Sequence, residues 1–274
     1  MPKATYMYWQ KRFDRENPDE AIEKEILDIR KENPNYGYRS LCKALRNKGV
    51  VVNKKKVQRI VQKLGIQVKS FTRKSRKYNS YKGEVGKIAP NRIRRRFNTN
   101  IPHQKITTDT DTTEFKYYEI DKKGRMTTKK LYLDPFMDMY NGEIISYGIS
   151  KTPSSENILN ALDKAIEITK DCKYRRTFHS DRGWAYQMKA YKYKLKENRI
   201  YQSMSRKGNC YDNSKMENFF GILKQEMYYG KTYYSYEELE QAINTYIDYY
   251  NNKRIKEKLG WLSPVEFRIK RKIA

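Results

Sequence analysis

The sequence predicts an α/β fold: a mixed five-stranded sheet with helices, preceded by a small all-α domain. Two observations carry this prediction. Apolar residues recur at helical spacing near the N-terminus, whereas β-rich segments alternate with helical patterns after residue 100. Between these regions, a basic stretch with glycine and proline is typical of a linker. We therefore expect a helical domain over residues 1–68, a linker over 69–100 and an α/β domain with a C-terminal helical extension over 101–270.

The helical domain is predicted from two short amphipathic segments. The first covers residues 40–48 and ends before Gly49. The second covers residues 54–64, and Asn53 is in the position of its N-cap. An earlier helix, ending at Glu32, is expected to pack on this pair. Two short helices around a glycine-containing turn are typical of a helix-turn-helix.

Charge indicates the partner of this region. The chain has a net charge of +27, and residues 36–96 contain twenty lysines and arginines against a single acid, Glu84. Such a concentration of positive charge is typical of a phosphate-binding surface, and the alternative is a solvated basic face. Arg59 and Gln58 can make bidentate contacts to bases, whereas lysines more often contact phosphates. The residues expected to contact DNA here are Lys54, Lys55, Lys56, Gln58, Arg59 and Lys63 of the second helix, and Arg94, Arg95 and Arg96 of the linker.

The elements of the α/β domain are predicted from periodicity and turn residues. Strands are expected over Ile106–Ile120, Lys130–Tyr140, Glu143–Ser150, Arg176–Ser180 and Ile200–Met204, and helices over Ser154–Thr169, Ala185–Lys196 and Asn213–Met227. Three hairpin-linked strands followed by helix, strand, helix, strand and helix give the order of a ribonuclease-H-like fold. In that fold the first strand, the fourth strand and the last long helix can bring three carboxylates together.

Acids occur at these places. Asp181 follows the fourth strand, and Glu217 lies one turn into the last helix, at the edge of its buried face. Phosphodiester chemistry uses carboxylates that hold two divalent metals about 4 Å apart, and magnesium prefers oxygen ligands. We therefore expect two Mg²⁺ or Mn²⁺ ions. Lys224, two helical turns after Glu217, is expected to contact DNA, whereas Asp212 and Asn213 are expected to cap the helix.

Several runs of residues resemble the integrase core of the IS-three family of bacterial insertion sequences. They are Met204–Asn213, Glu217-Asn218-Phe219-Phe220, His179-Ser180-Asp181-x-Gly183, Tyr249-Tyr250-Asn251-Asn252-x-Arg254 and Leu259-Gly260-Trp261-x-Ser263-Pro264-x-Glu266. Thirty-five residues separate Asp181 from Glu217, which is the spacing that the resemblance implies. Residues 35–39 and 53–59 resemble the helical domain that precedes this core in the family.

The resemblance implies a catalytic and metal-binding triad of Asp111, Asp181 and Glu217. The first position has two candidates. Asp111 matches the family pattern of an aspartate followed by x-Thr-Glu-Phe, whereas the interval from Gln104 points to Asp109. We choose Asp111 and keep Asp109 as the alternative, since a strand would direct both side chains to one face. From the C-terminal motif, Arg254 joins the residues expected to contact DNA.

The resemblance further implies a transposase that cleaves the 3′ ends of an insertion sequence and joins them to target DNA. The expected partners are double-stranded DNA, further copies of the chain on that DNA and a first-reading-frame protein. The alternative functions are a nuclease of the same fold without strand transfer and a DNA-binding regulator with an inactive core. The chain shows no signal peptide and no apolar run that could span a membrane, and its three cysteines form no CxxC pair. We therefore expect a bacterial cytoplasmic protein, associated with the nucleoid when bound to DNA.

Overall fold

The computed structural model describes residues 2–13, 17–68, 88–110, 115–121, 123–207 and 209–273. The chain divides into two compact units, Met1–Ser70 and Phe71–Ala274. Among the described residues, no helix is both long and apolar enough to cross a membrane.

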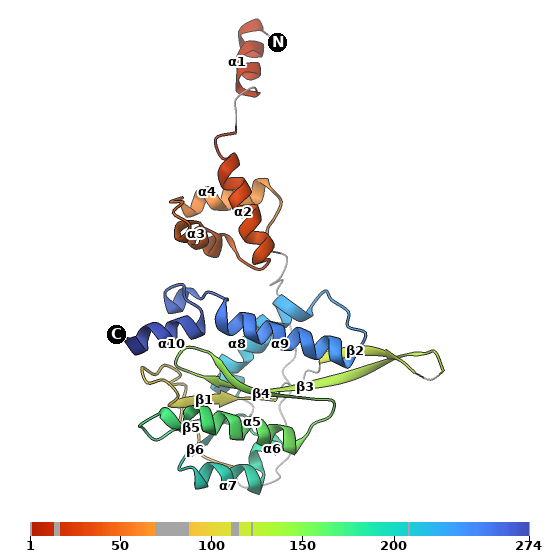
Figure 1. Ribbon diagram of the computed structural model, residues 1–274, viewed down its shortest axis with the longest axis vertical. Helices are drawn as coiled ribbons and strands as arrows, with labels where there is room; N and C mark the ends of the chain where they lie inside the picture. Colours follow the sequence, from red (N-terminus) through yellow and green to blue (C-terminus); the bar gives the residue numbers. More distant parts are fainter. Residues whose placement is uncertain are drawn as a thin grey trace. The chain divides into compact units, whose positions relative to one another are not determined.

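The first unit is built from α-helices (Figure 1). They are α1 (Lys3–Phe13), α2 (Glu20–Glu32), α3 (Tyr38–Asn47) and α4 (Lys54–Lys63). Their core consists of residues at helical spacing, such as Ile26 and Ile29 of α2, Leu41 of α3 and Val57 of α4, all buried. The predicted N-cap is confirmed, because the Asn53 side chain accepts a hydrogen bond of 2.9 Å from the backbone N–H of Lys55.

The second unit contains the mixed sheet. Its strands are β1 (Lys105–Thr108), β2 (Phe115–Ile120), β3 (Met126–Asp138), β4 (Ile144–Ser150), β5 (Thr177–Ser180) and β6 (Tyr201–Met204). Its helices are α5 (Ser155–Ile168), α6 (Trp184–Gln187), α7 (Lys189–Glu197), α8 (Ser214–Leu223), α9 (Tyr236–Asn252) and α10 (Pro264–Ile273). Short 3-10 helices cover Thr169–Asp171, Cys210–Asn213 and Glu257–Leu259, and α8 continues as a π-helical turn over Lys224–Tyr228.

The sheet joins an antiparallel half to a parallel half. Its strand order is β2-β3-β1-β5-β6, and β4 also pairs with β3. The long strand β3 is antiparallel to β1, β2 and β4, whereas β1, β5 and β6 are parallel. The parallel strands follow from their connections, because α5 lies between β4 and β5, and α6 and α7 lie between β5 and β6. The carboxyl ends of β1, β5 and β6 therefore meet at one edge.

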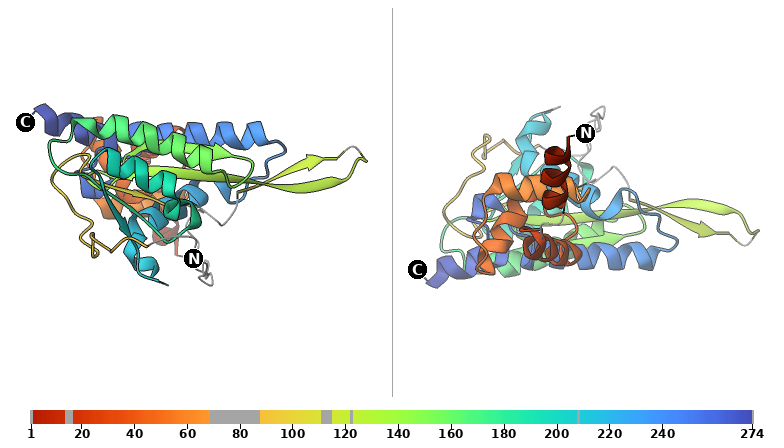
Figure 2. Two further views of the ribbon diagram at one scale, coloured as in Figure 1. Left: turned by 90° about the horizontal axis from the view of Figure 1, so that it is seen from below. Right: turned by 90° about the horizontal axis from the view of Figure 1, so that it is seen from above.

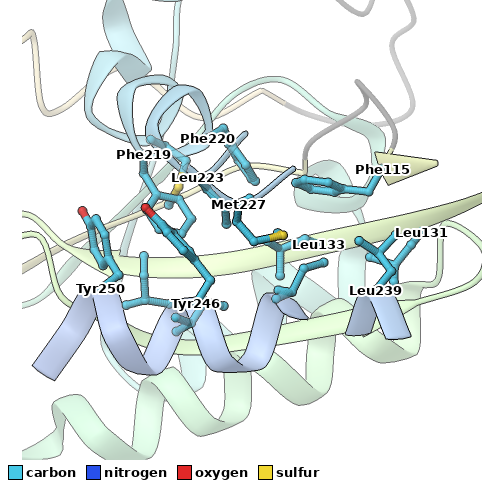
Figure 3. Close-up of a cluster of buried hydrophobic side chains, with 14 of the residues drawn as sticks. Phe115, Leu131, Leu133, Phe219, Phe220, Leu223, Met227, Leu239, Tyr246 and Tyr250 are labelled. Carbon is cyan, nitrogen blue, oxygen red and sulfur yellow. The ribbon is translucent and has the colours of Figure 1, made fainter. Parts of the chain in front are cut away.

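Two apolar cores cover the two faces of the sheet. On one face α5 and α7 pack against side chains such as Ile106, Phe136 and Phe178. On the other face α8 and α9 pack against β2, β3 and β4, as Figures 2 and 3 show. In α8 the buried side chains are Met216, Phe219, Phe220 and Leu223, the spacing of one helical face. This packing fixes the helix that carries Glu217.

Two predicted elements are each divided in the structure. The strand predicted over residues 106–120 is two strands, β1 and β2, which pair with opposite ends of β3. The described sheet consequently has six strands rather than five. The helix predicted over residues 185–196 is divided into α6 and α7, because Met188 has an extended backbone with ψ of 145°. Neither break is marked by glycine or proline, so composition gives no sign of either.

Candidate active site

Two aspartates lie side by side at the carboxyl ends of β1 and β5. The register pairs Thr107 of β1 with His179 of β5. Continued by two residues, it places Asp109 beside Asp181. Both residues directly follow their strands, so their carboxylates lie at the same edge of the sheet. Asp111, the first choice from the sequence, lies outside the described residues.

The carboxylate of Asp181 is held by the loop that follows β5. The backbone N–H of Gly183 donates a hydrogen bond of 2.7 Å to its Oδ1. A Cβ atom at Gly183 would lie 2.9 Å from that same oxygen, so a side chain at position 183 would displace the carboxylate. Burial raises the pKa of Asp181, which means that its charged form lacks full compensation in this environment.

A buried tyrosine lies next to the paired aspartates. Tyr186 of α6 is fully buried, and its hydroxyl is 3.4 Å from Oγ1 of Thr108 and 3.2 Å from Oγ1 of Thr110. Burial raises the pKa of Tyr186 well above its ordinary value, and the charges of Asp109 and Asp181 contribute. The tyrosine is therefore a neutral phenol that holds the two threonines flanking Asp109.

Asp134 on β3 is a third acid whose charge acts on Tyr186. It is buried, and burial raises its pKa to about 6. Asn157 of α5 donates a hydrogen bond of 3.1 Å to its Oδ2. Asp134 thus adds negative charge beside Tyr186, a role that was not expected from the sequence.

Asn213 connects the end of β1 to the start of α8. Its Oδ1 accepts a hydrogen bond of 2.5 Å from the Thr107 hydroxyl. Its Nδ2 donates to the carbonyl of Thr108 at 3.1 Å and to Oδ2 of Asp109 at 3.2 Å. Asn213 occupies the N-cap position of α8, as expected, but its side chain makes no cap hydrogen bond and bonds β1 instead.

Glu217 lies four residues after Asn213, one helical turn into α8. It is exposed, yet partial burial of its carboxyl raises its pKa. Within the described ranges, no three or more His, Cys, Asp or Glu side chains are grouped closely enough to hold a metal ion. The structure therefore brings Asp109 and Asp181 together and places Glu217 on the adjoining helix.

A buried histidine connects the strands behind this edge. His179 has its Nδ1 2.9 Å from Oγ of Ser203 and its Nε2 2.9 Å from the carbonyl of Asp212. Because a carbonyl only accepts, Nε2 carries the proton and Nδ1 accepts from the serine. Ser203 in turn accepts from the backbone N–H of Arg92 at 2.9 Å. Burial lowers the pKa of His179 to about 4, so the ring is neutral at pH 7.

Asp212, directly before Asn213, is completely buried and surrounded by donors. Arg206 donates to both of its oxygens at 2.9 Å, and Arg95 donates to Oδ1 at 3.1 Å. These hydrogen bonds, that of Arg206 first, hold the pKa of Asp212 well below its usual range. Arg94, Arg95 and Arg96, which were predicted to contact phosphates, are all exposed, and Arg95 also has this intramolecular partner.

Two further residues predicted to contact DNA, Lys224 and Arg254, are engaged within the protein. Arg254 makes a bidentate ion pair with Glu226, with its Nη2 2.7 Å from Oε1, and the Glu226 side chain is 1% exposed. Lys224 is buried, with Nζ 5.4 Å from the centre of the Phe115 ring. Lys224 is thus turned to the core, and Arg254, 19% exposed, has its guanidinium held by Glu226 of the π-helical turn. We therefore leave both out of the DNA-binding proposal.

In the helical unit the predicted basic face of α4 is present, and acids of the α2 region pair with part of it. Lys56 and Arg59 contact Asp19 at 2.5 and 3.0 Å, and Lys63 contacts Glu23 at 2.7 Å. The remaining predicted residues, Lys54, Lys55 and Gln58, are exposed. Such surface pairs are weak, so a polyanion can replace the acids.

Known families match this architecture. Models described as integrase core domain match residues 100–210 and 217–271, and a model described as HTH-like domain matches residues 17–75. An uncharacterized transposase-like protein of Haemophilus influenzae is 48% identical over 80% of this chain and 94% of its own length. The InsK protein of insertion sequence element IS150 in Escherichia coli is 39% identical over 98% of this chain and 90% of its own. The transposase InsF of insertion sequence IS3A in Escherichia coli is 30% identical over 85% of this chain and 76% of its own.

Proposed function

This chain belongs to the IS-three family of insertion-sequence transposases, and we propose that it performs metal-dependent 3′-end cleavage and strand transfer of an insertion sequence. One observation carries the proposal. Asp109 and Asp181 lie side by side at the ends of β1 and β5, and Asn213 links Asp109 to the helix that carries Glu217. This arrangement supplies oxygen ligands from two strands and a helix at one edge of a sheet.

We assign the first position of the triad to Asp109 in place of Asp111. Support comes from the register: the last pair between β1 and β5 is Thr107 with His179, and two residues further along each chain are Asp109 and Asp181. Asn213 and Tyr186 also hold Asp109 and its neighbours in place. Phe115, the last residue of the pattern that favoured Asp111, begins β2, which is a separate strand from β1.

The donor set fits Mg²⁺ or Mn²⁺, because carboxylate oxygens are the ligands that these ions prefer. Burial raises the pKa of Asp181 and of Glu217, and a divalent cation would favour their charged forms. Asp109, Asp181 and Glu217 would hold the ions. When bound, two such ions activate the attacking oxygen and stabilise the leaving oxygen of a phosphodiester.

The chain's own residues position this chemistry. The Gly183 N–H orients the Asp181 carboxylate, and the Asn213 amide orients that of Asp109. Water is the nucleophile for cleavage, and the freed 3′-hydroxyl is the nucleophile for joining, so no covalent protein intermediate is required. The exposed lysines and arginines of α4 and of the linker bind DNA. The protein acts in a bacterial cytoplasm, together with further copies of the chain and a first-reading-frame partner.

The test uses Asp109→Asn, Asp111→Asn, Asp181→Asn and Glu217→Gln in a magnesium-dependent strand-transfer assay with DNA of the element's ends. We expect Asp109→Asn, Asp181→Asn and Glu217→Gln to lose cleavage and joining while retaining DNA binding, since each loses one charge and one ligand. Glu167→Gln, an exposed acid of α5, is the matched control. Near-normal turnover in Asp181→Asn or Glu217→Gln would refute the proposed reaction. If Asp111→Asn is inactive and Asp109→Asn is active, the first residue of the triad is Asp111.

The same assay distinguishes the competing functions. Cleaved but never joined DNA would identify a nuclease of this fold. Metal-independent DNA binding without any cleavage would identify a regulator with an inactive core.

A further inference from the structure

A two-stranded ribbon extends from the second unit. Strands β2 and β3 pair from Phe115↔Leu131 to Ile120↔Met126. In both views of Figure 2 and in Figure 1 this ribbon reaches well beyond the helices of the unit. Its root is buried, because Phe115 and Leu131 belong to the core, whereas Ile120 and Met126 are 76% and 63% exposed. The ribbon is therefore packed into the core at one end and exposed to solvent at the other.

The ribbon is strongly basic. Residues 115–131 include six lysines and arginines against two acids, a net charge of +4. One of these acids, Asp121, belongs to the turn, where its Oδ1 accepts hydrogen bonds of 2.8 Å from the backbone N–H groups of Lys123 and Arg125. Because the Asp121 carboxylate is bonded to the backbone of the turn, it neutralises little of the positive charge of the lysines on the two strands.

One face of the ribbon concentrates the cations. Lys116 and Lys130 are direct cross-strand partners, and both are exposed. Like charges in this position destabilise a β-ribbon. The same face continues through Tyr118↔Thr128 to the exposed pair Ile120↔Met126. This face thus has lysines near the root of the ribbon, a tyrosine in the middle and apolar side chains at the tip. Nucleic-acid-binding surfaces have this composition, since their cations contact phosphates and their apolar groups contact the nucleobases.

The root of the ribbon is fixed to the region of the active site. The backbone N–H of Lys116 donates to the hydroxyl of Tyr228 at 2.8 Å, in the π-helical turn that extends α8. The backbone N–H of Tyr118 donates to the carbonyl of Tyr233 at 2.9 Å. Strand β2 starts six residues after Asp109, and α8 carries Glu217. The position of the ribbon relative to the acids is therefore set by its connection to β1 and by its hydrogen bonds to the segment that follows α8.

We propose that the β2–β3 ribbon binds duplex DNA beside the reacting phosphodiester, with Lys116 and Lys130 on phosphates and the tip in a groove. The inference rests on the proposed function for the site, and adds to it a second DNA contact on the catalytic unit. A two-stranded ribbon fits the major groove of B-DNA. Because the ribbon has a net charge of +4, it favours polyanionic DNA as its partner. A second copy of this chain, with a net charge of +27, would repel it.

The test measures how the affinity for a 40-base-pair duplex of random sequence depends on salt. The full chain carries Asp181→Asn, so that no reaction consumes the DNA. We expect Lys116→Ala with Lys130→Ala to lower the slope of log K against log salt by about 2, because each lost phosphate contact removes about 0.9. The control, Lys164→Ala with Lys196→Ala, removes the same charge from exposed positions of α5 and α7 and should leave the slope unchanged.

A second pair of substitutions tests the tip. Ile120→Ser with Met126→Ser changes only exposed positions, so folding is retained. It should weaken duplex binding severalfold at constant slope. Equal slopes in the lysine pair and its control would overturn the proposal, as would a tip variant that alters the oligomeric state of the DNA-free protein but not its DNA affinity. These binding readouts do not depend on strand transfer, so failure of the proposed reaction is detected separately.

Discussion

Replacing Asn213 with alanine should lower both stability and activity, by separable amounts. The side chain is 3% exposed and makes hydrogen bonds to Thr107, Thr108 and Asp109. At roughly 1 kcal/mol net for each hydrogen bond, their loss should cost about 3 kcal/mol of unfolding free energy. The same change removes a hydrogen bond from the carboxylate of Asp109, so Asp109 and the start of α8, two sides of the proposed metal site, lose this direct connection.

Asn251 provides a matched control. Its Oδ1 accepts from the backbone N–H of Ile144, and its Nδ2 donates to the carbonyl of Ile144, both at 2.9 Å. These two hydrogen bonds join α9 to β4 and touch no acid of the proposed triad. Asn251→Ala should therefore cost about 2 kcal/mol of stability and leave the reaction of the folded protein unchanged.

The assay combines urea unfolding with strand-transfer rates over a magnesium titration, at a temperature where all variants are folded. Asn213→Ala should need more magnesium for half-maximal rate and should lose roughly tenfold or more in maximal rate, as expected when reacting groups are misplaced. The reasoning is refuted if Asn213→Ala keeps the rate and magnesium requirement of the unchanged protein. It is equally refuted if Asn251→Ala loses as much activity, because a general loss of rigidity would then explain both.

Two further predictions concern His179 and Gly183. Since burial lowers the pKa of His179 from 6.5 to about 4, the stability it contributes is present above pH 6.5 and is lost as the pH falls towards 4, by up to about 3 kcal/mol. Urea unfolding at several pH values should show this loss, and His179→Gln should show less of it; identical pH profiles would contradict the prediction. Gly183→Ala should reduce strand transfer about tenfold or more, because the added Cβ lies 2.9 Å from Oδ1 of Asp181. Gly221→Ala on α8, where the Cβ meets nothing within 4 Å, should keep full activity, and equal rates in the two variants would count against the argument.

Local sequence was sufficient for most helices and for two of the acids. The apolar spacing of α8 and the N-cap of α4 depend on residues within a few positions of each other, so both were predicted from the chain alone. The same holds for Asp181 after its strand and for Glu217 one turn into its helix. The basic composition of the first hundred residues likewise pointed to DNA without any knowledge of the fold.

The partners of buried polar groups could not be predicted in this way. Arg254 was expected on a DNA-binding surface, yet it forms a bidentate pair with Glu226, twenty-eight residues away. Asn213 was expected to cap its own helix, yet it bonds residues of β1 that are more than a hundred positions earlier. A polar side chain in a motif has the same local signature whether it faces DNA, solvent or a distant strand.

The sequence by itself determined most of the helices before residue 228, the position of two acids and the basic character of the protein. The tertiary structure alone showed that β1 and β2 are separate strands and that β1 pairs with β5, with Thr107 beside His179. The physical reason is the range of the interactions involved. Helical periodicity and capping act over one or two turns, whereas strand register is decided by hydrogen bonds between segments some seventy residues apart, here β1 and β5.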